Sequence, residues 1–394
     1  MKKVKKVGII TQYYKSINYG GNLQAYALCF ILNNMNCESE QICYAYKREK
    51  QNNIFGVVAR KGFGVLFGKV SLKLKALANK KEIYKSAVLK RKAFYHFNSE
   101  LIPHSKIVFT NETIATTKND YDIFITGSDQ VWNIDNYNGA YRLDFVPFEK
   151  NKMSYAAGIS SGKLQQKDKK IFRDTFKSYL AISVREKSAV GALQPLTNLQ
   201  VEWVIDPTLL LTDKQWNEVC SQRKVQEKYL FCYFLGDPLI KVKNIIEFAN
   251  RNGLKIVNFP YACGTSSSKS DFGDYRVYDA SPQDFLSYVK HAEYVFTDSF
   301  HASVFSHIYK RNFFVFNRKG FKVMNDRIYS LTDLFDTGDR FCDSKEKCTL
   351  EYIESLPPIN YDREFPKFEA MKEKSINFLK DNLKKVEEKL NGVD

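Results

Sequence analysis

Short apolar runs alternate with amphipathic stretches along most of this 394-residue chain. Clear examples of the apolar runs are 6–14, 121–127, 229–236 and 294–300. They are rich in Val, Ile, Phe and Tyr, which favours β-strands, and the stretches between them repeat apolar residues at helical spacing. Strands that alternate with helices are typical of α/β proteins with mostly parallel sheets. We therefore predict an α/β fold, and the chain length favours two domains over one core.

The strand–helix pattern restarts after a polar connection that ends near residue 225. We therefore place one Rossmann-like domain at 1–224, with a basic helical insertion at about 47–100, and a second at 225–350. The tail, 351–394, carries apolar residues on one face and is expected to form a long amphipathic helix. Two such domains facing each other enclose a cleft. Ligands of open α/β sheets bind beyond the carboxyl ends of the strands, so residues just after strands are the functional candidates.

The net charge of +16 is concentrated in the segment 47–92, which holds 14 Lys or Arg and two acidic residues. Such a segment suits anionic partners, namely phosphorylated substrates, an anionic membrane surface or nucleic acid, or is a solvated lysine-rich surface. Lys outnumbers Arg here and no nucleic-acid-binding module accompanies it, so we expect no nucleic-acid partner. Association of 47–92 with a membrane surface stays open.

No run of about 18 apolar residues is present, and the N-terminus reads as a first strand instead of a signal peptide. We expect a cytoplasmic protein, peripheral to the inner face of the membrane if the basic segment binds lipid. The eight cysteines lack the spacing of metal knuckles, so we expect reduced, mostly buried thiols and no metal or redox cofactor.

Polar residues follow the first and third predicted strands. Asn18, Gly20 and Gly21 stand where a strand leads into a helix, and backbone N–H groups there are able to hold an anion; the alternative is glycine required only for turn geometry. In "DIFITGSDQVWN", Ser128 and Asp129 suit sugar hydroxyls and Trp132 suits the apolar face of a sugar. Equally, the two polar residues could satisfy a turn and Trp132 could fill a core.

Two further strand ends carry residues that are able to bind an anion or to donate a proton. Arg185 in "SVREKSAV" can clamp phosphate or carboxylate in a forked geometry, unless it pairs with the adjacent Glu186. His301 in "YVFTDSFH" stands at a strand-to-helix corner, where it is either a general acid or a packed structural residue.

Seven blocks in order resemble the polysaccharide pyruvyl transferase family: "NYGGNLQAYAL" (18–28), "DIFITGSDQVWN" (122–133), "SYAAGIS" (154–160), "SVREKSA" (183–189), "VIDPTLLL" (204–211), "TDSFHASVFS" (297–306) and "NDRIYSLTDLF" (325–335). The resemblance implies a fold similar to GT-B glycosyltransferases. It also implies transfer of pyruvate from phosphoenolpyruvate onto two hydroxyls of a sugar, as a ketal. The acceptor implied is a surface polysaccharide or its lipid-linked or nucleotide-linked precursor, and phosphoenolpyruvate is a co-substrate, so no cofactor is implied.

The resemblance also implies that His301 is the general acid and that Arg185 contacts the donor. From its position at a strand end, Asp129 is our own candidate for orienting an acceptor hydroxyl. We likewise assign Gly20 and Gly21 to the donor, and Asn18, Ser128 and Trp132 to the acceptor. Ser299, also assigned to the donor, stands where many members carry Arg. We expect Arg327 to replace that cation, with Lys310, Arg311, Arg318 and Lys319 as weaker substitutes.

Two other functions fit the same residues. A GT-B-like glycosyltransferase would use the same cations for the diphosphate of a nucleotide sugar. A non-catalytic module would bind a membrane surface or a polyanion through 47–92.

Overall fold

The computed structural model describes residues 5–45, 80–133, 138–159, 164–260, 272–319 and 325–392, with backbone alone for 80–86. Strands of the first half are β1 (Lys5–Ile10), β2 (Cys37–Gln41), β3 (Ile123–Thr126), β4 (Asn151–Ser154), β5 (Ile182–Val184) and β6 (Val201–Trp203). A parallel sheet has the order β2-β1-β3-β4. Isolated parallel bridges from β4 and its following residues continue it to the β5-β6 pair.

Strands of the second half are β7 (Tyr229–Tyr233), β8 (Lys255–Asn258), β9 (Tyr275–Arg276), β10 (Tyr294–Thr297), β11 (Asn312–Phe316) and β12 (Phe341–Cys342). They form a second parallel sheet in the order β12-β11-β10-β7-β8-β9. The predicted α/β fold with parallel sheets is thus confirmed. We did not predict β9 and β12, because two residues are too few to show a strand pattern.

In each sheet, the chain adds strands toward one edge and then reverses, continuing on the other side of the first strand. The chain moves outward from β1 to β2 and then returns to β3 on the other side of β1. In the second sheet it moves from β7 to β8 and β9 and then returns to β10. The carboxyl ends of strands beside such a reversal flank a crevice that helices leave open, and this is where open α/β sheets bind ligands.

The helices are α1 (Tyr19–Asn34), α4 (Lys80–Leu101), α5 (Gln166–Phe176), α6 (Lys187–Leu193), α7 (Asp213–Asn217), α8 (Val242–Arg251), α9 (Pro282–Lys290), α10 (Phe300–Ile308), α11 (Asp326–Leu334), α12 (Leu350–Ser355) and α13 (Pro366–Leu390). Ser281 caps α9 ahead of Pro282. Most of the basic segment, up to residue 79, lies outside the described residues, and α4 covers the remainder. Within the described ranges, no helix is long and apolar enough to cross a membrane.

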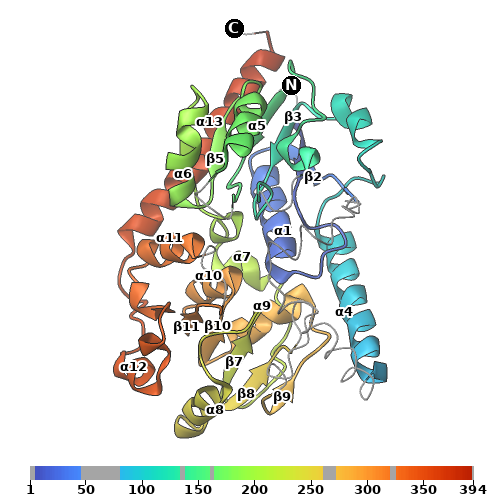
Figure 1. The fold of residues 1–394 in the computed structure, drawn as a ribbon. Coiled ribbons are helices and arrows are strands. Elements are labelled where there is room, and N and C mark those ends of the chain that lie inside the picture. Colours follow the sequence, from blue (N-terminus) through green and yellow to red (C-terminus); the bar gives the residue numbers. More distant parts are fainter. Residues whose placement is uncertain are drawn as a thin grey trace.

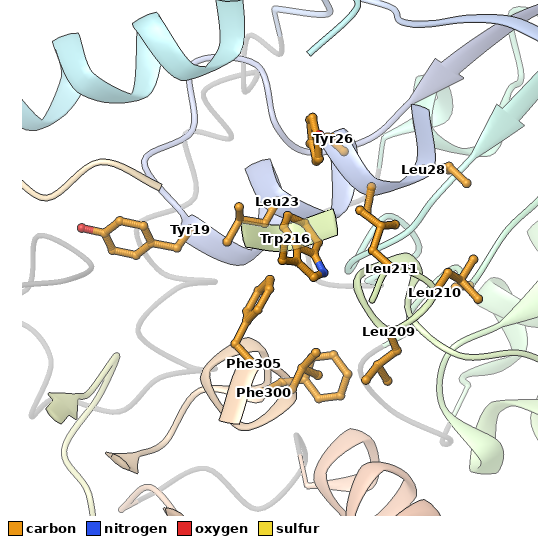
Figure 2. Packing of buried hydrophobic residues seen from close by; sticks show 14 of the residues in the cluster. Tyr19, Leu23, Tyr26, Leu28, Leu209, Leu210, Leu211, Trp216, Phe300 and Phe305 are labelled. Carbon is orange, nitrogen blue, oxygen red and sulfur yellow. The ribbon is translucent and has the colours of Figure 1, made fainter. Parts of the chain in front are cut away.

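One hydrophobic cluster joins the two halves (Figure 2). Trp216 of α7 lies between an α1 ring and an α10 ring. Its centroid is 5.7 Å from that of Tyr26 and 5.0 Å from that of Phe305. Aromatic pairs at these distances are attractive beyond the area they bury. The contact therefore holds α1 of the first half close to α10 of the second.

Helix α13, red in Figure 1, runs from the lower half back along the upper half. Near its start, Phe368 stacks on Phe335 beside α11, at 4.5 Å. Further along, the Ser375 hydroxyl accepts a hydrogen bond from Ile205 N at 3.0 Å, just after β6. The predicted C-terminal helix is confirmed, and it contacts elements of both halves.

Candidate active site

His301 lies at the corner between β10 and α10, in the first turn of the helix, as predicted. The ring is buried, with 7% of the residue exposed. Ser299 is the residue that caps this helix: its hydroxyl accepts a hydrogen bond from Ala302 N at 3.5 Å. Ser299 is itself only 4% exposed, and its predicted contact with the donor stays a prediction.

Gly20 of the first half lies next to His301 of the second half. We expected Gly20 and Gly21 in a turn that precedes the helix. Helix α1 begins at Tyr19, however, so both glycines lie inside its first turn. A Cβ atom on Gly20 would lie 1.9 Å from His301 Nδ1. The imidazole of the second half therefore lies directly on the backbone of α1, where only glycine leaves room for it.

Arg185, just after β5, is surrounded by carboxylates. Its Nη1 lies 3.1 Å from Asp206 Oδ2 and 3.5 Å from Asp129 Oδ1, and its Nε and Nη2 lie 3.2 Å from Glu186 Oε1. Burial disfavours the guanidinium charge, but Glu186, Asp129 and Asp206 outweigh it and raise the pKa of Arg185. The pairing with Glu186 that the sequence left open is present, and two other acids add to it.

Asp206 was not predicted as a site residue, and it lies at the centre of this cluster. It is 1% exposed and caps the short 3₁₀ turn that follows β6. Its Oδ2 lies 3.7 Å from His301 Nε2. Burial raises the pKa of Asp206, but the attraction of His301 and Arg185 and the hydrogen bond from Thr208 hold it well below its usual range. An Asp before Pro reads as a turn residue, so only the fold reveals this contact.

Arg327, in the first turn of α11, belongs to the same cluster. Its guanidinium carbon lies 6.0 Å from the Phe300 ring centroid, and that of Arg185 lies 4.9 Å from the same centroid. Burial, with repulsion from Arg185 and Arg318, lowers the pKa of Arg327 to about 10, so it stays charged at neutral pH. Arg318 instead binds Asp298, with Nε 2.7 Å from Oδ2.

Three buried polar atoms in this cluster have no hydrogen-bond partner among the described residues. They are His301 Nε2, Glu186 Oε2 and Arg327 Nε. An unsatisfied buried polar atom costs free energy, and such atoms in a native protein call for an explanation. Because they gather at the strand ends where α/β sheets bind ligands, a polar ligand is the explanation we favour.

Trp132 and Ser128, assigned to the acceptor, are fully engaged in the protein. Trp132 is 3% exposed, and its Nε1 donates to Tyr141 O at 3.2 Å. Its ring packs against Phe172 and Phe176 of α5. Ser128 is 0% exposed, with its hydroxyl 3.0 Å from both Ala156 O and Asp206 Oδ2. Their assignment to the acceptor stays a prediction, which substitution of Trp132 tests.

The remaining predicted residues lie around the start of α1. Asn18 is exposed, and its Oδ1 accepts a hydrogen bond from Gly21 N at 3.3 Å. Asp129 is 8% exposed and adopts a left-handed backbone with φ of 64°, which Asp tolerates better than most residues. Its Oδ2 lies 3.5 Å from where a Cβ on Gly21 would be. Asp129 thus joins the α1 start to Arg185.

Known proteins resemble this chain in fold and in sequence pattern. The putative UDP-N-acetylglucosamine 2-epimerase of Listeria monocytogenes is 11% identical, with a TM-score of 0.53 over 100% of this chain and 98% of that one. The Rickettsia bellii enzyme is 10% identical, with a TM-score of 0.53 over 97% of each chain. The Methanocaldococcus jannaschii enzyme is 13% identical, with a TM-score of 0.52 over 95% of this chain and 99% of that one. This likeness shows a GT-B-like fold.

A comparison with curated protein sequences gave no match. Residues 18–320 match the polysaccharide pyruvyl transferase family. The match includes Gly20, Arg185, Asp206 and His301, and it ends before Arg327. Because it covers most of the chain, the protein belongs to the polysaccharide pyruvyl transferase family.

Proposed function

We propose that this protein transfers pyruvate from phosphoenolpyruvate to two hydroxyls of a sugar, forming a ketal on a surface polysaccharide or its precursor. Family membership supports pyruvyl transfer. The observation that carries the proposal is the seating of His301 on Gly20, beside two arginines that share the Phe300 ring. That arrangement puts a proton donor next to cationic groups suited to an anionic donor.

The reaction needs one proton delivered and two removed. The methylene carbon of phosphoenolpyruvate gains a proton and becomes a methyl group, which leaves C2 electrophilic. One acceptor hydroxyl attacks C2, the C–O bond to phosphate breaks, and the second hydroxyl closes the ketal. The two hydroxyl protons are balanced by the new methyl hydrogen and by the hydrogen phosphate that leaves. No oxidant or reductant is required.

We assign the proton delivery to His301. General acid catalysis of this kind raises a rate by ~10²–10⁴-fold. Arg327 is the leading partner for the donor phosphate or carboxylate, because its Nε has no hydrogen-bond partner among the described residues. Arg185 is charged but already neutralised by three carboxylates, so it orders the site as much as it attracts the donor. Asp129 stays our candidate for orienting an acceptor hydroxyl.

The test is incubation with phosphoenolpyruvate and a panel of sugar, nucleotide-sugar and lipid-linked oligosaccharide acceptors. We expect one acceptor to gain the mass of a pyruvyl group while inorganic phosphate appears in equal amount. His301→Ala should abolish both signals and keep the circular dichroism of the wild type. Release of UDP or GDP from a nucleotide sugar, without consumption of phosphoenolpyruvate, would favour the glycosyltransferase alternative instead.

We also propose that the protein binds an anionic membrane surface, where a lipid-linked acceptor resides. The described part of the basic segment includes Arg91 and Lys92, both exposed on α4. Basic side chains near anionic lipid each contribute ~1 kcal/mol to binding. Arg91→Glu/Lys92→Glu should weaken sedimentation with phosphatidylserine vesicles at low salt, whereas the charge-matched Lys384→Glu/Lys389→Glu variant on α13 should not. Equal binding by the wild type and the Arg91/Lys92 variant would reject the surface role of α4.

A further inference from the structure

We infer that Asp206 is a positioning residue for His301: its carboxylate faces Nε2 and keeps the ring in place against Gly20, at the junction of the two halves. The contact between the two side chains is a property of the protein itself. Only the role of the positioned ring as a proton donor rests on the proposed function.

Hydrogen bonds fix the position of the Asp206 carboxylate. Its Oδ1 accepts hydrogen bonds from Thr208 N at 3.0 Å and from the Thr208 hydroxyl at 2.7 Å. The residue before it is fixed as well, because Ile205 N donates to Ser375 and Ile205 O accepts from the Tyr155 hydroxyl at 3.1 Å. The carboxylate therefore keeps one position, with Oδ2 turned to His301 and Arg185.

His301 is oriented by this carboxylate and by the absence of a side chain at Gly20. Nε2 is buried and has no hydrogen-bond partner among the described residues, and Asp206 Oδ2 lies 3.7 Å away, at ion-pair distance. Nδ1 lies on the side of the ring that faces Gly20, where a Cβ would intrude. A carboxylate beside one ring nitrogen favours the tautomer that carries its proton there, which is how histidine–carboxylate pairs operate in general.

Asp206 is charged at neutral pH. His301 and Arg185 hold the pKa of Asp206 well below its usual range, against the effect of burial, so a carboxylate faces the ring. Arg185, Asp129, Glu186 and Arg327 are the other charged groups of the cluster, and α10 begins beside them.

A purely structural role is the alternative, in which Asp206 serves only to neutralise Arg185. The wild-type protein distinguishes the two without any substitution at Asp206. In ¹⁵N-histidine-labelled protein, with the His301 signals identified by their loss in His301→Ala, we expect the neutral ring to carry its proton on Nε2. A neutral ring protonated on Nδ1 would overturn the inference.

Asp206→Asn keeps the shape of the side chain and removes its charge. We expect the neutral His301 ring to lose its preference for a proton on Nε2, because an amide donates as well as accepts hydrogen bonds. Asp129→Asn is the matched control, because Asp129 also contacts Arg185 but no ion pair joins it to His301. An unchanged tautomer in Asp206→Asn, or an equal change in Asp129→Asn, would refute the inference. If Asp206→Asn does not fold, the wild-type tautomer decides.

Pyruvyl transfer separates this inference from the proposed function. If both hold, Asp206→Asn lowers the kcat of pyruvyl transfer and also changes the ring tautomer. A changed tautomer with no pyruvyl transfer by the wild type would refute the function and leave the residue pair standing. Pyruvyl transfer with an unchanged tautomer would do the reverse.

Discussion

Gly20→Ala is the sharpest test of the site geometry. The added Cβ would lie 1.9 Å from His301 Nδ1, whereas ordinary contact begins at 3.4 Å, so the ring or the helix has to move by about 1.5 Å. Overpacking of this kind costs ~1–3 kcal/mol of stability. A misplacement of about 1 Å at a reacting group can lower the rate ~10²-fold. We therefore expect Gly20→Ala to lose stability moderately and pyruvyl transfer by ~10²-fold or more.

The assay combines phosphate release from phosphoenolpyruvate with thermal unfolding of the same preparations. Gly191→Ala in α6 is the matched control, because nothing lies within 4 Å of the position that its Cβ would take. That control should keep wild-type activity and gain up to ~1 kcal/mol, the usual advantage of Ala over Gly in a helix.

A double-mutant cycle identifies the clashing partner. In a His301→Ala background the ring is gone, so Gly20→Ala should no longer reduce stability. Two results would refute this account of the site. One is wild-type activity and stability in Gly20→Ala; the other is a stability loss that persists after His301 is removed.

Three further substitutions test the surroundings of the site. Burial lowers the pKa of His307 to about 3, so below pH 6.5 the unfolded chain binds more protons than the folded one, and the free energy of unfolding decreases as the pH is lowered. His307→Phe should remove ~2 kcal/mol of the stability loss between pH 7 and pH 5, measured by urea unfolding. Trp132→Phe removes the hydrogen bond that Trp132 Nε1 donates to Tyr141 O, so it should lower the free energy of unfolding by ~1–3 kcal/mol in the same assay. The acceptor KM should stay unchanged, and a raised KM would show that Trp132 contacts the acceptor. Ser375→Ala leaves the buried Ile205 N–H unpaired and should cost ~1–3 kcal/mol, with the predicted loss absent if Ser375 contributes no such bond.

Much of the fold could be predicted from local patterns. The apolar runs at 6–14, 121–127, 229–236 and 294–300 correspond to β1, β3, β7 and β10, and the cap of α9 by Ser281 ahead of Pro282 is a similarly local feature. These features depend on neighbouring residues alone, since periodicity and capping act within a few positions. The two-residue strands β9 and β12 were not predictable, because their pairing comes from neighbouring strands.

The site was predictable only in part. The position of His301 in the first turn of α10 follows from its place just after a strand. An aromatic ring after a strand end, such as Trp132, suits a sugar or a core equally. Only the fold shows that this ring packs against Phe172 and Phe176 of α5. Arg185 likewise offered a clamp or an ion pair, and its carboxylate partners come from three separate segments.

By itself, the sequence determined the α/β class, the order of the elements and the candidate strand ends, because these follow from the spacing of apolar and polar residues along the chain. Only the tertiary structure decided which strand ends meet. Asp206 and His301 are far apart in the sequence and lie 3.7 Å apart in the fold, and Gly20 matters because a ring from the other half lies against it. Such contacts depend on how two sheets are packed through α1, α7 and α10, and no local pattern encodes that packing.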